Sequence, residues 1–411
     1  MGDHALGEVV IVGASLAGLR AAEALRDDGF DGAVTMVGAE PHLPYDRPPL
    51  SKKVLSGEWE PERSALRRPE EFEKLELRLR LGVRATSLDT ANRRVGLDDG
   101  DGLAYDGLII ATGAAVRRLP HQPELEGVFS LRTLDDSIAL RDALTSGSPR
   151  VVVVGAGFIG AEVASTAKSL GCDVTIVEML PVPLARGLGE EMGSACAGLH
   201  RDNGVDLRLG VGIASIEGTA RVEGVRLTDG TTIPADVVVV GVGVAPATEW
   251  LEGSGLEVRD GLVCDAQLAA GPPGVFAAGD LARWPNGLFG EEMRVEHWTN
   301  ASEQGAHAGH NLMAWAGRRE GPATPYDAVP FFWSDQYGLR IQFLGRAGDG
   351  DEVRVVHGAV DDRAFVAVYG NRGRLRGVLG VSRPRLVMGY HRLLASGASW
   401  DDALAHAAAT E

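Results

Sequence analysis

The stretch GASLAG, residues Gly13–Gly18, directly follows the apolar run EVVIV at Glu8–Val12. A glycine-rich turn between an apolar strand and a helix is where dinucleotide-binding folds hold a pyrophosphate. Ser15 stands here in place of the middle glycine of that fingerprint. Serine adds a Cβ, but its hydroxyl could donate to a phosphate oxygen. The loop alone leaves two interpretations open: a nucleotide site, or a turn that only packs a helix.

The same pattern occurs a second time with the fingerprint complete. The run VVVV at 151–154 leads into GAGFIG at Gly155–Gly160, a helical segment follows, and a further strand at 173–177 ends at Glu178. This is the sequence of a strand, a turn, a helix and a strand. An internal duplication of a nucleotide-binding unit is therefore the main organisational feature of the chain.

Each residue type in the second loop suits a dinucleotide. Gly155 permits the tight turn, Gly157 the close approach of a pyrophosphate, and Gly160 the close packing of the helix. Glu178 stands about 20 residues further on, where a carboxylate accepts hydrogen bonds from ribose hydroxyls. A carboxylate there would repel the 2′-phosphate of NADPH, so we predict a preference for NADH. The positive charge of Arg186, a little further along the chain, would weaken this preference.

The first copy has matching parts. A helix is expected at 16–28 and a strand at 33–37, which ends near the acidic Glu40. Each copy is completed much later by an apolar strand that leads into a turn of small residues, at 105–113 and at 235–243. Small residues at such turns let the backbone approach a ligand closely.

The predicted fold class is α/β, with two Rossmann-like domains and a C-terminal α+β domain. The first domain is discontinuous and comprises residues 1–113 and 245–325, and the second comprises residues 114–244. Residues 326–411 have a different texture, first strand-like and aromatic and then helical, and form the third domain.

Composition narrows the class of protein. The formal charge of −17 over 411 residues argues against wholesale nucleic-acid binding. No apolar run approaches the roughly 20 residues of a membrane span, and the acidic start of the chain is unlike a secretory signal, so we expect a cytoplasmic protein. The three cysteines, Cys172, Cys196 and Cys264, form no C-x-x-C pair. We therefore predict neither a redox dithiol nor a metal site.

Two further stretches have both a functional and an ordinary interpretation. YDRPPLSK at Tyr45–Lys52 is either a ligand loop or a stiff loop with a solvated lysine. PGVFAAGD at Pro273–Asp280 ends in a carboxylate that either caps a helix or accepts hydrogen bonds from a ligand.

Together with VEHWTNASEQG at 295–305 and FFWSDQY at 331–337, these motifs give the chain a family resemblance. The chain resembles the FAD-dependent NADH:ferredoxin reductases of bacterial oxygenase systems, and specifically the putidaredoxin reductase type. The resemblance rests on the order of these motifs and extends over nearly the whole chain. The resemblance implies a glutathione-reductase-like fold with FAD in the first domain and NADH in the second.

The resemblance also implies site residues. It assigns FAD contacts to Gly13, Ala14, Ser15, Gly18, Glu40, Arg47, Lys52, Val83, Ala111, Thr112, Gly113, Arg132, Gly279, Asp280 and Trp298. It assigns NADH contacts to Gly155, Gly157, Phe158, Ile159, Gly160, Glu162, Glu178, Arg186 and Gly243. Lys52 would lie beside the flavin ring, and we hypothesise a catalytic pair of Lys52 with Glu162. The alternative is that Lys52 only orders its loop.

The activity implied is hydride transfer from NADH to FAD, followed by single-electron transfer to a [2Fe–2S] ferredoxin that supplies a cytochrome P450 or a Rieske-type oxygenase. Without a dithiol, electrons must leave the flavin directly for an outside acceptor. A rubredoxin reductase or NADH oxidase-like enzyme is one alternative. An NADH-sensing flavoprotein like apoptosis-inducing factor is another.

One stretch indicates where a ferredoxin would dock. Between Asn371 and Arg392 the chain has no acidic residue, and ferredoxins are typically acidic. The arginines concerned are Arg372, Arg374, Arg376, Arg383, Arg385 and Arg392. A second candidate cluster is Arg63, Arg67 and Arg68, and Trp333 is a further candidate. The alternative is that these arginines pair with acids elsewhere. We expect a monomer or weak homodimer.

Overall fold

The computed structural model describes residues 6–410 of the chain. Its contacts form two compact units. The first holds the chain up to Asp46 together with Ala65–Ala115 and Ala245–Pro330, and the second holds Arg47–Ser64, Val116–Val244 and the chain from Phe331 onward. The loop Arg47–Ser64, expected in the first domain, thus makes its contacts in the second unit. The boundaries of the three predicted domains stay a prediction.

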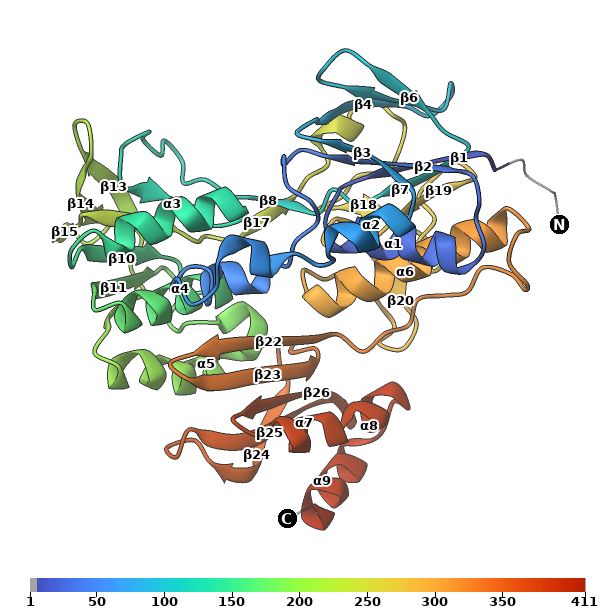
Figure 1. Cartoon of the computed structure of the whole chain (residues 1–411). Coiled ribbons are helices and arrows are strands. Elements are labelled where there is room, and N and C mark those ends of the chain that lie inside the picture. Colours follow the sequence, from blue (N-terminus) through green and yellow to red (C-terminus); the bar gives the residue numbers. More distant parts are fainter. Residues whose placement is uncertain (1–5, 411) are drawn as a thin grey trace. The chain divides into compact units, whose positions relative to one another are not determined.

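The first unit is built on a parallel sheet with the strand order β19-β7-β1-β2-β3 (Figure 1). The strands are β1 (Glu8–Val12), β2 (Ala33–Gly38), β3 (Leu77–Leu81), β7 (Gly107–Ile110) and β19 (Val275–Ala277). All of β7 and β19, and β1 after Glu8, are buried, as expected for parallel strands covered on both faces. The expected strand, glycine turn and helix are present, because α1 (Leu16–Asp27) follows β1.

A second helix, α6 (Trp298–Trp315), packs on α1. A Cβ added to Gly305 would lie 2.2 Å from the carbonyl oxygen of Ala17, so glycine permits this close crossing. The remaining elements of the unit are α2 (Pro69–Lys74), β4 (Ala85–Asp89), β5 (Arg94–Leu97), β6 (Gly102–Ala104), η3 (Glu249–Leu251), β18 (Leu262–Val263), β20 (Ala282–Asn286) and β21 (Glu291–Arg294).

The second unit contains a matching parallel sheet with the order β12-β11-β10-β16-β9. Its strands are β9 (Val128–Phe129), β10 (Arg150–Val154), β11 (Asp173–Glu178), β12 (Asp206–Leu209) and β16 (Val237–Val240). Its helices are α3 (Leu134–Thr145), α4 (Phe158–Ser169) and α5 (Ala185–Asp202), and the loop after residue 46 contains η1 (Pro48–Ser51) and η2 (Pro61–Ser64). The chain adds β13 (Ile213–Gly218), β14 (Val222–Leu227) and β15 (Thr232–Pro234), and passes between the units near β8 (Ala114–Val116) and β17 (Val244–Pro246).

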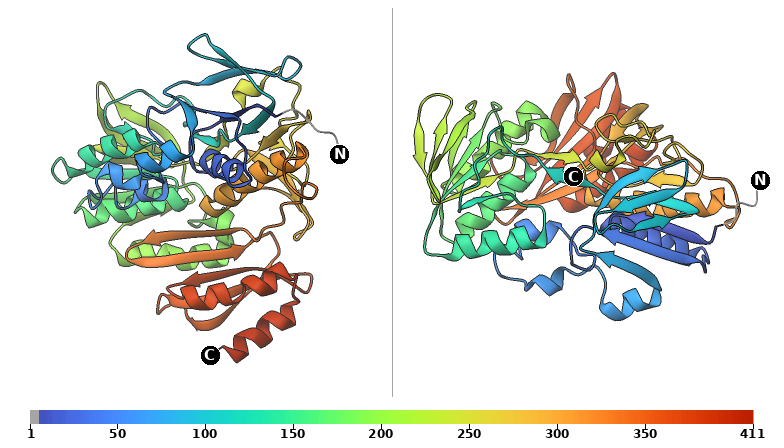
Figure 2. Two further views of the ribbon diagram at one scale, coloured as in Figure 1. Left: turned by 45° about the vertical axis from the view of Figure 1, so that its right-hand side comes forward. Right: turned by 90° about the horizontal axis from the view of Figure 1, so that it is seen from above.

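The C-terminal part of the second unit is an antiparallel sheet of order β22-β23-β26-β25-β24, followed by three helices in the described chain (Figure 1). Figure 2 shows the same segment, orange to red, in two further views. The strands are β22 (Phe331–Gln336), β23 (Leu339–Gly345), β24 (Glu352–Ala359), β25 (Ala364–Asn371) and β26 (Arg374–Val381). The helices are α7 (Pro384–Gly389), α8 (His391–Ala395) and α9 (Trp400–Ala409).

The two faces of this sheet have different neighbours. Phe343, on the face that also carries Phe332, shares a hydrophobic core with Leu188 and Met192 of α5. Trp333 belongs to the opposite face, because side chains alternate along a strand. The predicted α/β fold class, with a C-terminal α+β part, is confirmed. Among residues 6–410, the structure contains no helix with both the length and the apolar character needed to cross a membrane.

Candidate functional site

In the first unit, the turns after β1, β7 and β19 meet at the carboxyl edge of the sheet. The amide of Ala111 donates to the carbonyl of Val12 at 2.7 Å, and the amide of Ala278 donates to Ile110 at 3.0 Å. Gly13 has φ of +123°, and a Cβ there would lie 2.0 Å from the carbonyl oxygen of Ala111. Only glycine fits this position. The edge is where α/β sheets bind their ligands.

Ser15 is the N-cap of α1, and its side chain makes no capping hydrogen bond. The first turn of α1 carries no acidic residue, whereas α3 carries Asp135 and Asp136 in its first turn. The first turn of α1 therefore adds no carboxylate of its own to the positive helix end, which favours an anion such as a pyrophosphate. Ala14, Ser15 and Gly18 lie together at this helix end, and their contacts with FAD stay a prediction.

Glu40 follows β2 at the same edge of the sheet. Tyr45 donates its phenolic hydrogen to a carboxylate oxygen of Glu40, and the amide of Val83 donates to the carbonyl of Gly38 at 3.0 Å. A Cβ added to Gly38 would lie 2.5 Å from Cβ of Ala14, so this segment packs on the glycine loop. The structure thus brings Glu40 and Val83 to the loop that contains Ser15.

Thr112, Gly113, Gly279 and Asp280 complete this edge. The hydroxyl of Thr112 donates to the carbonyl of Ala247 at 2.8 Å, and Gly113 adopts a positive φ of +67°. The carbonyl of Asp280 accepts a hydrogen bond from Arg294 at 3.0 Å.

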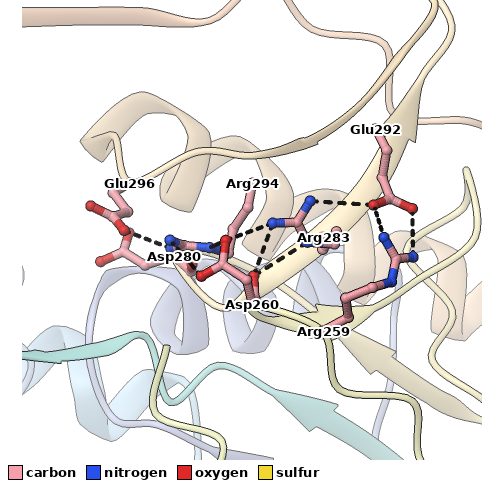
Figure 3. Close-up of polar contacts among 7 residues, drawn as sticks. All are labelled: Arg259, Asp260, Asp280, Arg283, Glu292, Arg294 and Glu296. Carbon is pink, nitrogen blue, oxygen red and sulfur yellow. Dashed lines mark hydrogen bonds and ion pairs between the residues drawn. The ribbon is translucent and has the colours of Figure 1, made fainter. Parts of the chain in front are cut away.

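Arg294 belongs to an ion-pair network that anchors the Asp280 turn (Figure 3). It pairs with Glu296 at 2.6 Å, and Asp260 joins it to Arg283. Glu292 extends the network to Arg259, whose hydrogen bond lowers the pKa of the Glu292 carboxyl. Because only 11% of the Arg294 side chain is exposed, its contacts with the Asp280 turn are largely shielded from water.

Helix α6 contributes two side chains to this edge of the sheet, those of Gln304 and Trp298. The fully buried Gln304 accepts a hydrogen bond from the amide of Gly279 at 2.9 Å, while its Nε2 has no partner among the described residues. The indole of Trp298 donates to Asp46 at 2.6 Å. An orphaned buried donor under the Asp280 turn fits a ligand that supplies an acceptor. Gln304 was inside the quoted motif at 295–305, but its sequence gave no sign of a role.

In the second unit, the complete glycine loop has a comparable geometry. Gly155 has φ of +99°, and a Cβ there would lie 2.4 Å from the carbonyl oxygen of Gly241. A Cβ added to Gly157, in contrast, would meet no atom within 4 Å. Gly157 is exposed at the start of α4, which again has no acid in its first turn. The loop therefore leaves open space at the position where a pyrophosphate approaches.

Glu178 lies at the end of β11, and its side chain is hydrogen-bonded to this loop. Its two carboxylate oxygens accept the amides of Ala156 at 2.7 Å and Leu180 at 2.9 Å. Each oxygen retains a lone pair for a ribose hydroxyl. Ile159 is 47% exposed on α4, and Arg186 is exposed on α5 without an ionic partner among the described residues.

Phe158 and Gly243 are two further members of the predicted set. Phe158 contacts Phe332 edge to face, with ring centroids 4.5 Å apart, so it packs on the C-terminal sheet. Gly243 follows β16 with φ of +97° and open space around it. Both follow a strand of the second sheet at its carboxyl edge.

The predicted pair of Lys52 and Glu162 is present within the second unit. Nζ of Lys52 lies 2.6 Å from Oε2 of Glu162, which is 3% exposed. Ser51 and Ser334 also donate to Glu162, at 2.5 and 2.7 Å, and neither was predicted. Only the adjacency of Ser51 to Lys52 could have indicated one of them.

Arg47 and Arg132, both expected at FAD, contact each other in the second unit. A guanidinium N–H of Arg47 donates to the carbonyl of Arg132 at 2.6 Å. The contacts of Arg47, Lys52 and Arg132 with FAD stay predictions.

The three cysteines are free and buried. Burial raises the pKa of Cys196 and of Cys264 to about 12 and also raises that of Cys172. A buried, protonated thiol is a poor nucleophile, and a free thiol without a partner cysteine forms no disulfide for a flavin to reduce. The described chain therefore offers no dithiol to either loop.

The chain matches two known protein families over most of its length. Residues 7–305 match the pyridine nucleotide-disulphide oxidoreductase family, and residues 331–411 match the reductase C-terminal family. The chain therefore belongs to the pyridine nucleotide-disulphide oxidoreductases, flavoproteins that use FAD and NAD(H), and it carries the C-terminal domain of the reductases among them. The uncapped Ser15, the space at Gly157 and the orphaned Gln304 fit these two cofactors.

Individual relatives match over most of their length. The chain is 38% identical to rhodocoxin reductase of Rhodococcus erythropolis over 390 residues, covering 94% of this chain and 89% of the relative. It is 38% identical to the ferredoxin–NAD(+) reductase component of the anthranilate 1,2-dioxygenase system of Burkholderia cepacia, covering 95% of each. Among solved structures, putidaredoxin reductase in its covalent complex with putidaredoxin matches with a TM-score of 0.91, 31% identity and 98% of each chain covered.

Proposed function

We propose that this protein is an NADH:ferredoxin reductase that takes a hydride from NADH onto FAD and passes single electrons to a [2Fe–2S] ferredoxin, which supplies a cytochrome P450 or a Rieske-type oxygenase. One observation carries the proposal: two dinucleotide loops are combined with three buried, isolated cysteines. Electrons that enter through NADH therefore have no dithiol to reach and must leave for an external acceptor. The relatives that match over nearly the whole chain are reductases of this kind.

The bound cofactors would be held by the residues at the two sheet edges. FAD supplies the ability to accept a hydride and release electrons singly. Ser15 and the first turn of α1 would bind its pyrophosphate, and Asp280 its polar chain. Gly157 and Glu178 would bind NADH, and the carboxylate of Glu178 favours NADH over NADPH. Lys52 would stabilise the negative charge that develops beside it during the reaction, and Glu162 would hold Lys52 in place as its ion-pair partner.

We also propose a narrower docking surface for the ferredoxin. Arg372 and Arg374 lie at the beginning of β26, and Arg383 and Arg385 follow its end. A strand of eight residues spans about 25 Å, so these arginines form two groups. Arg372, Arg374, Arg383, Arg385 and Arg392 are exposed and form no ion pair within residues 6–410.

The register of the C-terminal sheet favours the second group. Trp333 pairs with Gln342, which pairs with Gly380, three residues before Arg383. A Cβ on Gly380 would lie 2.1 Å from the side chain of Val387, so α7 covers the face that carries Trp333. The surface formed by Trp333, Arg383 and Arg385 is the one we propose for an acidic ferredoxin.

In the other candidate cluster, one arginine of the three forms no ion pair with the described residues. Arg67 pairs with Glu23 at 2.8 Å and Arg68 with Glu71 at 3.3 Å. Arg63 instead stacks over Trp59, 4.4 Å from the ring centroid. These pairings give Arg67 and Arg68 a structural role and leave Arg63 as the candidate.

Three acceptors test the function. The NADH-reduced protein is mixed with a [2Fe–2S] ferredoxin, with air-saturated buffer or with rubredoxin, and flavin reoxidation is followed by absorbance. We expect fast reoxidation by the ferredoxin alone. Fast reoxidation by oxygen or rubredoxin would support those acceptors, and a long-lived reduced complex with all three would support NADH sensing. The proposed cytoplasmic location and monomeric or weakly dimeric state are tested by cell fractionation and by sedimentation.

A further inference from the structure

Glu162 is the point where three segments far apart in the sequence meet. Oε2 accepts hydrogen bonds from Ser51 at 2.5 Å and Lys52 at 2.6 Å, both in the loop that follows residue 46. Oε1 accepts a hydrogen bond from Ser334 of β22 at 2.7 Å. The carboxylate thus uses one oxygen for the lysine loop and the other for the C-terminal domain.

The direction of these hydrogen bonds is fixed by chemistry. A carboxylate only accepts, so Ser334 must give its single hydroxyl hydrogen to Glu162. The hydroxyl oxygen in turn accepts Nε2 of Gln336 at 3.0 Å. Ser334 and Gln336 are both fully buried, so water does not compete for these groups. Donation therefore runs in one direction, from Gln336 through Ser334 to Glu162.

Ser334 reaches Glu162 because helix α4 lies along strand β22. Phe158 contacts Phe332, Glu162 contacts Ser334, and the side chain of Ser165 accepts the amide of Tyr337 at 2.7 Å. Residues 158, 162 and 165 are four and three positions apart and therefore share one face of the helix. Residues 332 and 334 are alternate positions and share one face of the strand. Ser165 thus holds the same packing contact without touching Glu162.

We propose that Ser334 is a positioning residue for hydride transfer: it holds the carboxylate of Glu162 in the orientation that places Lys52. The inference rests on the proposed role of Lys52 in the NADH reductase. A buried carboxylate oxygen without a donor is costly, so removal of the Ser334 hydroxyl turns Glu162 away from its present geometry. Lys52 and Ser51 then lose their common partner. The C-terminal domain would in this way contribute to NADH oxidation as well as to ferredoxin docking.

Two variants separate positioning from packing. Ser334→Ala removes the donor to Glu162, whereas Ser165→Ala removes a hydrogen bond from the same helix–strand contact. Both are made in the full chain loaded with FAD. Hydrogen exchange is measured at the amides of Lys52, Val54 and Ser56, which bond within the loop. Stopped-flow absorbance gives the limiting rate of flavin reduction and the apparent Kd for NADH.

For Ser334→Ala we expect faster exchange at these three amides and a limiting reduction rate lower by about tenfold, with the Kd for NADH nearly unchanged. Ser165→Ala should leave both readouts at the wild-type value. Ser334→Thr retains the hydroxyl and should restore both. Identical behaviour of Ser334→Ala and Ser165→Ala, or unchanged exchange in Ser334→Ala, would overturn the proposal.

A double-mutant cycle keeps the test decisive if threonine does not fit. Glu162→Gln should speed loop exchange, and adding Ser334→Ala should change it no further, because Ser334 acts through Glu162. Additive effects would contradict this. The exchange measurement needs no NADH. If wild-type protein were not reduced by NADH, the proposed function would fail while the loop measurement still judged the role of Ser334.

Discussion

Nζ of Lys52 lies 2.6 Å from Oε2 of Glu162, and the two side chains are only 17% and 4% exposed. The ion pair therefore differs from the many exposed pairs of this acidic chain, whose contribution to stability is small. A pair shielded from water is costly to break, because one charge is left without a partner. It also fixes the lysine loop to helix α4, which begins at the complete glycine loop.

Replacing Lys52 tests whether this pair takes part in catalysis. We expect Lys52→Ala to slow flavin reduction by NADH at least tenfold, about 1.4 kcal/mol in activation free energy. Its neighbour provides the control: Lys53 is 48% exposed and pairs with the exposed Glu58. Lys53→Ala should reduce at the wild-type rate in stopped flow. A wild-type rate in Lys52→Ala would leave the lysine with a loop-ordering role only.

Gly157 and Gly160 of the second loop differ in the space around them, and two alanine variants test this difference. A Cβ at Gly157 meets no atom, and its φ of −73° suits any residue, so Gly157→Ala should keep its melting temperature. The methyl group would fill the space for the pyrophosphate and raise the Kd for NADH about tenfold or more. A Cβ at Gly160 would lie 2.1 Å from the carbonyl oxygen of Gly155, so Gly160→Ala should lose roughly 1–3 kcal/mol of stability.

Thermal unfolding and NADH titration together check this pair of variants. A drop in melting temperature for Gly157→Ala, or unaltered NADH affinity, would contradict the assignment of the open space to the nucleotide.

The division of the arginines by β26 leads to a prediction on electron transfer. Arg383→Gln with Arg385→Gln should slow ferredoxin reduction and flatten its dependence on salt, because these charges would steer an acidic partner. Arg372→Gln with Arg374→Gln removes the same charge at the other end of the strand and should have a smaller effect. Turnover with ferricyanide is the internal control. Equal effects of the two double variants would assign the attraction to net charge alone.

The stability of the protein should depend on a buried histidine. His200 is fully buried in α5, its Nδ1 lies 2.7 Å from the hydroxyl of Tyr337, and burial lowers its pKa to about 4. In the unfolded chain a histidine binds its proton near pH 6.5. The stabilising effect of a neutral His200 is therefore complete above pH 6.5 and is lost as the pH falls towards 4.

Urea unfolding at pH 7, 6 and 5 measures this loss. The free energy of unfolding should fall by at most about 1.4 kcal/mol per pH unit for this residue. His200→Gln should reduce the slope, and the exposed His391→Gln should not. An unchanged slope in His200→Gln would show that other groups cause the acid sensitivity.

The sequence was sufficient for features that depend on local chemistry. The two glycine loops, the strands before them and the acids after them lie where their spacing predicted, because tight turns and buried parallel strands have strong local signals. Contacts between distant segments had no such signal. Ser334 and Glu162 are 172 residues apart, and the orphaned amide of Gln304 is visible only after α6 has packed.

The arginine run shows a second limit of sequence reasoning. Its members are close along the chain, but an extended strand separates its two ends, so closeness in sequence did not mean one surface. The loop Arg47–Ser64 shows a third limit, because its neighbours in sequence belong to the first unit while its contacts belong to the second.

The path of the chain through the two units also has a consequence for its synthesis. The chain changes unit after residues 46, 64, 115, 244 and 330, so no single cut yields two complete units. Strand β7 receives its outer neighbour β19 only when residues 275–277 have been made. Until the ribosome reaches that point, the sheet of the first unit lacks its strand β19. The first unit can therefore complete its sheet only after residues 116–244 of the second unit have been made.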